Sequence, residues 1–240
     1  MYLKKIYNIL NKLSPFELQE PWDNSGLQVG TMSDDIKQVY LSLDVDSSLL
    51  DEVKNNSLIV THHPLIFKGL KSLNTSVHPS KLIKKMIKKD ISLIAMHTNF
   101  DTTHLNKYVA CEVLGYKDIT CKGHVCYFDT NCSFDELILH VKNSLGLKII
   151  RSTGEQKQIK KCALTTGSGG DLIDQVDADC FLSGDFKYHQ ALEAKENNLN
   201  LLDIGHFESE CHFSACLHKN LINFPLKAII TNSKNPFRYN

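Results

Sequence analysis

The sequence predicts an α/β protein with mostly parallel central sheets, organised as two interleaved lobes. Three observations lead to this class. Short apolar runs of strand length recur along the chain, and segments with helical spacing of apolar residues lie between them. No internal repeat, low-complexity segment or long linker interrupts this alternation. Strands that alternate with helices are joined by right-handed crossovers, which give parallel sheets.

The first half of the chain alternates regularly between helix and strand. The spacing of Leu3, Ile6 and Leu10 predicts an amphipathic first helix, and Pro15 fits the first position of a further helical turn. After Lys81, apolar residues at helical spacing face one way and lysines face the other. The expected elements are a helix at 2–13, a strand at 39–43, a short helix around 49–53, a strand at 57–60, a helix after 81, a strand at 91–96 and a helix at 105–114.

The second half continues the same alternation. Gly146 is expected to end a helix that begins at Phe134, and a glycine-rich run at 167–170 follows a strand. The polar stretch 152–158 is expected to be a hairpin tip. The expected elements are a helix at 134–145, a strand at 162–165, a helix around 172–176, a strand at 180–182, a helix at 188–196, a strand at 199–204, a helix around 213–217 and a strand at 228–230. We place one lobe at 1–120 plus 200–240 and the second at 121–199.

Composition excludes several classes of protein. The 240 residues are 42% hydrophobic and 22% charged, which suits a packed core rather than a disordered chain. Lys plus Arg and Asp plus Glu both number 27, so we expect neither a nucleic-acid partner nor a membrane partner. The N-terminal segment lacks a secretory apolar region, and no apolar run is long enough to span a membrane. The eight cysteines form no C-x-x-C pair, and we expect reduced, mostly buried thiols in a cytoplasmic protein.

The most informative feature is a set of imidazoles and carboxylates that follow predicted strands. Four strings share this position, namely THHP at 61–64, HTNFD at 97–101, SGD at 183–185 and GHFESE at 205–210. Ligand sites of open α/β sheets are built at equivalent ends of the strands. Mixtures of His and carboxylate suit Zn, Fe, Mn or Co. The sequence therefore predicts a metal site on a parallel sheet.

Each group also has an ordinary structural explanation. Adjacent strand residues point to opposite faces, so His62 and His63 share one centre only if the backbone breaks there, or each serves its own ion. The alternative is two loop histidines with routine hydrogen bonds. Asp101 is either a metal ligand or a turn or N-cap residue, and His97 is either a ligand or a residue that orients Asp101.

His206 and Glu210 stand four residues apart where a helix is expected to begin. This spacing places both side chains on one helical face, as in metal sites built on helices. The alternative is a solvent-facing pair. Glu208 lies on a different face, so Glu210 is the better candidate.

Several weaker groups receive only supporting roles. Asp44 and Asp185 each follow a strand, and His189 stands four residues after Asp185; capping or surface roles explain them as well as a supporting role at the site does. The glycine run 167–170 is either an anion-binding loop or a tight turn, and the lysine-rich helix is most simply a solvated face. No G-x-S-x-G string is present, and no cysteine lies in a motif at a strand end, so water activated by metal is the better nucleophile candidate.

Four motifs in order resemble the NIF-three-like family, whose members are labelled GTP cyclohydrolase 1 type 2 homologues. They are PWDNSGLQVG at 21–30, THHPL at 61–65, HTNFD at 97–101 and GHFESE at 205–210. The resemblance implies two interlocked α/β lobes, a toroidal homohexamer and two divalent ions per chain. The ligands that it implies are His62, His63, Asp101, His206 and Glu210. The stretch after Asp101 departs from the family pattern, because Thr102-Thr103-His104 stands where glycine-containing sequence is common.

Three functions are compatible with these residues. The first is a dinuclear metal-dependent hydrolase of a small molecule, such as a nucleotide or phosphorylated compound, in which His97 orients the site or relays a proton. The second is a non-catalytic metal chaperone, insertase or regulatory metal-binding protein. The third is a scaffold with structural histidines, which four ordered motifs make the weakest of the three.

Overall fold

The computed structural model describes residues 1–231 and 233–239, which form two compact units. The first unit comprises Met1–Phe100 and Phe213–Lys234, and the second comprises Asp101–His212 with the C-terminal residues from Asn235. The chain therefore passes between units at 100/101, 212/213 and 234/235, whereas the sequence placed the changes at 120/121 and 199/200. Each unit has its own sheet, and the two are described separately below.

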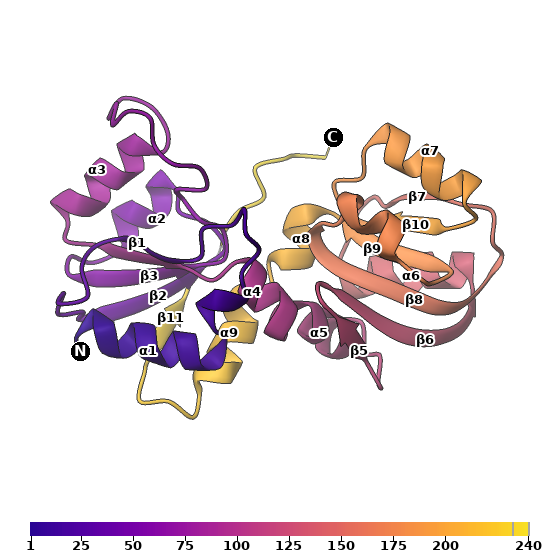
Figure 1. Cartoon of the computed structure of the whole chain (residues 1–240), viewed down its shortest axis with the longest axis horizontal. Coiled ribbons are helices and arrows are strands. Elements are labelled where there is room, and N and C mark those ends of the chain that lie inside the picture. Colours follow the sequence, from indigo (N-terminus) through magenta and orange to yellow (C-terminus); the bar gives the residue numbers. More distant parts are fainter. Residues whose placement is uncertain (232, 240) are drawn as a thin grey trace. The chain divides into compact units, whose positions relative to one another are not determined.

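The first unit is built on a five-stranded sheet in the order β1-β4-β3-β2-β11. The central pairs β2–β3 and β3–β4 are parallel, as is β2–β11, and β1 is antiparallel to β4. Figure 1 shows α2 and α3 on one side of this sheet and α1 and α9 on the other. The strands are β1 (Gly26–Val29), β2 (Gln38–Ser42), β3 (Ser57–Thr61), β4 (Ser92–Ala95) and β11 (Ala228–Ile230). The helical segments are α1 (Leu3–Leu13), η1 (Phe16–Leu18), α2 (Ser47–Glu52), α3 (Ser80–Lys88), α4 (Thr98–Phe100) and α9 (Phe213–Leu221).

Helices on both faces explain why the central strands of this unit are continuously apolar. All five residues of β3 are buried, as expected for a strand covered on each side. On one face, Ile59 and Leu93 belong to a core cluster with Leu50 of α2 and Met86 of α3. The side chain of Asp46 caps α2 by accepting a hydrogen bond from a backbone amide, which fixes where this helix starts.

The second unit is built on a six-stranded mixed sheet in the order β5-β6-β8-β9-β10-β7. The central strands β8, β9 and β10 are parallel, whereas β5–β6, β6–β8 and β10–β7 are antiparallel. The strands are β5 (Thr120–Lys122), β6 (Val125–Ser133), β7 (Arg151–Thr153), β8 (Gln158–Ser168), β9 (Cys180–Gly184) and β10 (Asn200–Asp203). The helical segments are η2 (Asp101–Leu105), α5 (Asn106–Tyr108), η3 (Val109–Val113), α6 (Phe134–Ser144), η4 (Gly170–Gln175), α7 (Tyr188–Glu196) and α8 (His206–Glu210).

The α/β class is confirmed, and the two sheets differ in how parallel they are. The first sheet matches the expected mostly parallel arrangement. The second is mixed, because β5–β6, β6–β8 and β10–β7 are antiparallel, and the β5–β6 hairpin was not predicted. The expectation of a hairpin tip at 152–158 is wrong, since β7 pairs with β10 rather than with β8. Alternation of polar and apolar residues in the short β5 and β7 is too brief to identify them from sequence.

The cysteine expectation needs one correction. Cys121 and Cys126 face each other across β5 and β6 and form a disulfide, so the prediction of reduced thiols is wrong for this pair. The other cysteines among the described residues are free, and Cys162, Cys180 and Cys216 are buried. In the part of the chain that the structure describes, no helix is both long and apolar enough to cross a membrane.

Candidate functional site

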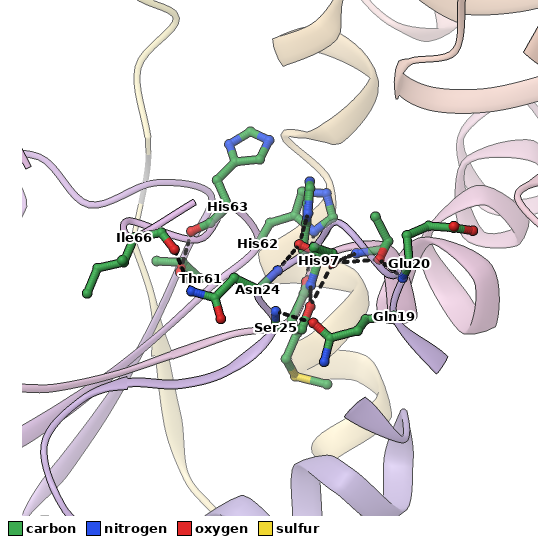
Figure 2. A network of polar contacts seen from close by, with 12 residues as sticks. Gln19, Glu20, Asn24, Ser25, Thr61, His62, His63, Ile66 and His97 are labelled. Carbon is green, nitrogen blue, oxygen red and sulfur yellow. Dashed lines mark hydrogen bonds and ion pairs between the residues drawn. The ribbon is translucent and has the colours of Figure 1, made fainter. Parts of the chain in front are cut away.

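Three imidazoles gather at the carboxyl ends of two neighbouring strands of the first unit. His62 and His63 directly follow β3, and His97 lies just after β4, its parallel neighbour. The ring centroid of His62 lies 5.1 Å from that of His63 and 5.2 Å from that of His97. The ring centroids of His63 and His97 are 5.7 Å apart. One ring nitrogen from each lies within 4.8 Å of the others. We call these three residues the imidazole cluster (Figure 2).

The backbone break that a shared centre requires is present. The strand β3 ends at Thr61, and the amides of His62 and His63 then donate to the carbonyls of Ser42, the last residue of β2, and of Leu43, which follows it. The Thr61 hydroxyl donates to the carbonyl of His63 over 2.9 Å, which closes this turn. His62 and His63 lie in a bend rather than in the strand, and their ring centroids are 5.1 Å apart.

Two rings of the imidazole cluster are oriented through Nδ1. His62 is fully buried, and its Nδ1 donates to the carbonyl of Met96 over 2.9 Å. His63 Nδ1 donates to a carboxylate oxygen of Asp44 over 2.8 Å. A histidine that ligates a metal usually donates its other ring N–H to a carbonyl or carboxylate, which sets the tautomer and the ring plane. With Nδ1 used in this way, Nε2 is the nitrogen that would bind an ion.

The third ring is held by a buried aspartate. His97 Nδ1 lies 2.8 Å from Asp23, whose side chain has no exposed surface. Asp23 also accepts hydrogen bonds from the Thr98 amide and hydroxyl and from the Ser25 hydroxyl. Burial by itself raises the pKa of Asp23. The hydrogen bond and the charge of His97, together with the hydrogen bond from Thr98, nevertheless hold this pKa well below its ordinary value. Asp23 is therefore an ionised acceptor that fixes the His97 ring.

The second unit contributes an imidazole and a carboxylate from α8. His206 and Glu210 lie one turn apart, with His206 Nε2 at 3.0 Å from a Glu210 carboxylate oxygen. The Nδ1 of His206 donates to Asp185 over 2.7 Å, which repeats the pattern of the first unit. Gly205 precedes the helix with a φ of 77°, a conformation that favours glycine at this strand-to-helix turn. Glu210 is almost fully buried.

Asp101 lies within a continuous helical run rather than at a helix cap. It is the first residue of η2 and directly follows α4, so the N-cap explanation does not apply. The carboxylate is buried and accepts a hydrogen bond from the Thr166 hydroxyl at 3.3 Å. Asn106 accepts from both the amide and the hydroxyl of Thr166 and so holds that residue in place.

The structure places each of the weaker candidates of the sequence. Asp44 and Asp185 orient His63 and His206, as described above. In the glycine-rich run, Gly167 has a φ of 67° and an added Cβ there would lie 2.1 Å from a Glu210 oxygen, so this position requires glycine. His189 is an exposed residue of α7 without an assigned role. The α3 lysines form the expected solvated face, with Lys85 paired to Asp51.

Sequence reasoning missed the role of Asp23. The segment 21–30 is one of the motifs that resemble the family, and the sequence assigned no role to Asp23 within it. No local spacing could reveal the contact, because Asp23 and His97 are 74 residues apart. The only available signal was the density of polar residues in an otherwise short segment between η1 and β1.

The fold and these residues define a class: an α/β protein with oriented imidazoles at strand ends and a His/Glu pair on a helix, the donor types of a divalent-metal site. Comparison with known sequences identifies the family within this class. The family model for Duf34/NIF3 (NGG1p interacting factor 3) matches residues 1–236, and the chain belongs to this family.

Relatives match over nearly the whole chain. A Campylobacter jejuni protein named GTP cyclohydrolase 1 type 2 homolog is 56% identical over 240 residues, covering 100% of both chains. A Helicobacter pylori protein named GTP cyclohydrolase 1 type 2 is 39% identical, with 98% of each chain covered. Among solved structures, Staphylococcus aureus protein SA1388 has a TM-score of 0.91 at 26% identity, covering 100% of this chain and 99% of that one. The chain therefore shares its fold with the Staphylococcus aureus protein and its length with the Campylobacter and Helicobacter proteins.

Proposed function

We propose that this protein is a metal-dependent hydrolase of a small molecule that binds two divalent ions. The proposed ligands are His62 and His63 of the first unit and Asp101, His206 and Glu210 of the second. The observation that carries the proposal is the common orientation of the imidazoles. His62, His63 and His206 each donate Nδ1–H to a carbonyl or carboxylate, which leaves Nε2 as the metal-binding nitrogen.

The donor set fits a borderline divalent ion. Imidazole nitrogens together with carboxylate oxygens suit Zn, Fe, Mn and Co, and the two carboxylates offset part of the charge of two ions. His206 Nε2 and a Glu210 carboxylate oxygen lie close together on one helical face, so this face offers both a nitrogen and an oxygen donor. When bound, such ions supply Lewis acidity, which polarises a substrate oxygen and lowers the pKa of water to about 7.

His97 is proposed to hold or relay a proton at Nε2. Its Nδ1 donates to the ionised Asp23 carboxylate, which leaves Nε2 as the ring nitrogen that can exchange a proton. Its side chain is only 15% exposed, so the ring is shielded from bulk water while it remains next to His62 and His63. This role is that of a general acid or base rather than of a ligand.

The proposed substrate is a nucleotide or another phosphorylated small molecule. The names of the Campylobacter and Helicobacter relatives support a purine nucleotide as the first compound to test, with hydrolytic opening of its ring as the reaction. We further propose that the protein acts in the cytoplasm as a homo-oligomer, for which the family resemblance suggests a toroidal hexamer.

Elemental mass spectrometry of tag-free protein, purified without chelators, tests the metal proposal first. We expect about two ions per chain, and a value near zero after reconstitution with Zn, Fe, Mn and Co would contradict the site. The loaded protein should then hydrolyse members of a nucleotide and phosphoester panel. Absence of turnover together with rapid transfer of metal to an apoprotein would instead favour a metal chaperone or insertase.

A further inference from the structure

Two exposed aromatic side chains lie beside the imidazole cluster in the first unit. Trp22 is 59% exposed and Phe67 is 43% exposed, and their ring centroids are 5.9 Å apart. Both contact the same imidazole edge-on, with Trp22 at 6.1 Å and Phe67 at 6.2 Å from the His97 ring. His97 therefore belongs both to the imidazole cluster and to this aromatic pair.

The loop that carries Phe67 is tied to the segment that carries Trp22. The Asn24 side-chain amide donates to the carbonyl of Ile66 over 2.5 Å, a contact visible in Figure 2. The Ile66 amide in turn donates to the side chain of Gln28, and the Gln28 side chain donates back to the carbonyl of Asn24. Two of these hydrogen bonds hold Ile66, the residue before Phe67, against Asn24 and Gln28, and the third joins Gln28 to Asn24.

The Trp22 segment is equally well anchored on its other side. The amide of Asp23 donates to the carbonyl of Glu20, whose own amide donates to the Thr98 hydroxyl. The Asp23 carboxylate then binds His97 and Thr98. Backbone positions on both sides of Trp22 are therefore fixed by polar contacts, although the indole itself is mostly in water.

Rigidly held and exposed aromatic rings are typical of ring-binding surfaces rather than of cores. A large apolar side chain stabilises the folded protein mainly when it is buried. Two adjacent rings that stay exposed therefore contribute little to folding stability. Aromatic side chains that are already held in place lose little conformational entropy when they bind a planar ring. Stacking also tolerates many different rings, because every planar ring has a face that can stack. The centroid distance of 5.9 Å leaves no space for a ring between Trp22 and Phe67, so a ligand would stack on an outer face.

We propose that Trp22 and Phe67 form a platform that binds the planar heteroaromatic ring of the substrate beside the imidazole cluster. This inference rests on the proposed function, since it assigns the ring-binding residues of the same site. The shared contact with His97 places a stacked ring next to the group that would exchange protons with it. The purine nucleotide proposed above as the first compound to test carries a ring of this class.

The protein carries its own probe, because Trp22 is its single tryptophan. Stacking on the indole is expected to quench its fluorescence. We would titrate the full chain with guanosine 5′-monophosphate and, as the matched compound without a ring, ribose 5-phosphate. Saturable quenching by the first compound alone is the expected result, and equal or absent quenching with both would overturn the platform.

Substitutions separate a ring platform from other uses of the same surface. Phe67→Leu keeps Trp22 as the reporter and should weaken binding about tenfold. Phe237→Leu is the matched control, since it removes another exposed ring (76%) from the second unit and should leave binding unchanged. Unchanged binding in Phe67→Leu, or a changed oligomeric state by mass photometry without a change in quenching, would overturn the proposal.

Metal content is measured on the same samples so that the two proposals fail separately. Quenching that persists after chelator treatment supports the platform whatever the number of ions. Absence of quenching in protein that holds about two ions overturns the platform and leaves the hydrolase proposal standing.

Discussion

The two units place their candidate ligands by different structural means. In the first unit, His62 and His63 directly follow a parallel strand, so the sheet itself determines their position. In the second unit, His206 and Glu210 lie on a helix of five residues, and Asp101 lies in a helical run. Strand ends are predictable from apolar runs, whereas a short helix requires knowledge of what packs against it. The comparison shows that similar donor groups can be positioned by a sheet or by a helix.

A common feature underlies this difference. Each oriented imidazole uses Nδ1 to contact an acceptor: a carbonyl or an aspartate in the first unit, and an aspartate in the second. This contact fixes the ring whether it stands on a turn or on a helix. If both units supply ligands, loss of a donor in either should lower metal content, and loss of an orienting group should have a smaller effect.

The largest expected effect comes from removing a ligand charge in the second unit. Glu210→Gln keeps the shape of the buried side chain but removes its negative charge, so we expect metal affinity to fall about 100-fold or more. Elemental mass spectrometry after dialysis against a metal buffer measures this loss. Glu208→Gln is the matched control on the same helix, since Glu208 contacts Asn235 rather than His206. Equal metal content in the two variants would remove Glu210 from the ligand set.

Truncation of a buried leucine tests whether both sheets are tightly packed. Leu58 on β3 and Leu182 on β9 are both fully buried in the centre of their sheets. Leu58→Ala and Leu182→Ala should each lower the free energy of unfolding by about 2–5 kcal/mol, because a cavity is left in each case. Urea unfolding followed by circular dichroism measures both, and Trp22 fluorescence reports on the first unit. A loss below about 1 kcal/mol in one variant would indicate a loosely packed core in that unit.

The orienting aspartates allow a direct comparison of the two units. Asp44→Asn in the first unit and Asp185→Asn in the second should each reduce metal affinity about 10- to 100-fold, since each holds a ligand imidazole through Nδ1. Competition with a fluorescent chelator gives the affinity of each variant. Similar losses would support equivalent roles of the two aspartates. No loss in one of them would show that its histidine is oriented adequately without it.

The sequence predicted much of the first unit and less of the second, for physical reasons. Runs such as that at Ser57–Thr61 are buried on both faces, so their apolar composition identifies the strand and therefore the position of His62. The sheet of the second unit depends on short, exposed strands such as Thr120–Lys122, which carry little periodic signal. The spacing of His206 and Glu210 was sufficient to predict their contact because it is local. The pairing of Asp23 with His97 depends on tertiary structure and could not be predicted in this way.

The last test concerns Asp23, which the sequence did not single out. Because its pKa is held below the unfolded value of about 3.9, its ionised form stabilises the fold above pH ~4, and this contribution is lost as the pH falls through the folded-state pKa. Asp23→Asn should therefore cost about 1–3 kcal/mol at neutral pH, and the difference from the natural protein should shrink in acid. Urea titrations at pH 7 and in acid, read by Trp22 fluorescence, measure it. Asp129→Asn, at an exposed position of β6, is the control. A difference that stays constant with pH would mean that Asp23 acts through its shape and hydrogen bonds rather than through its charge.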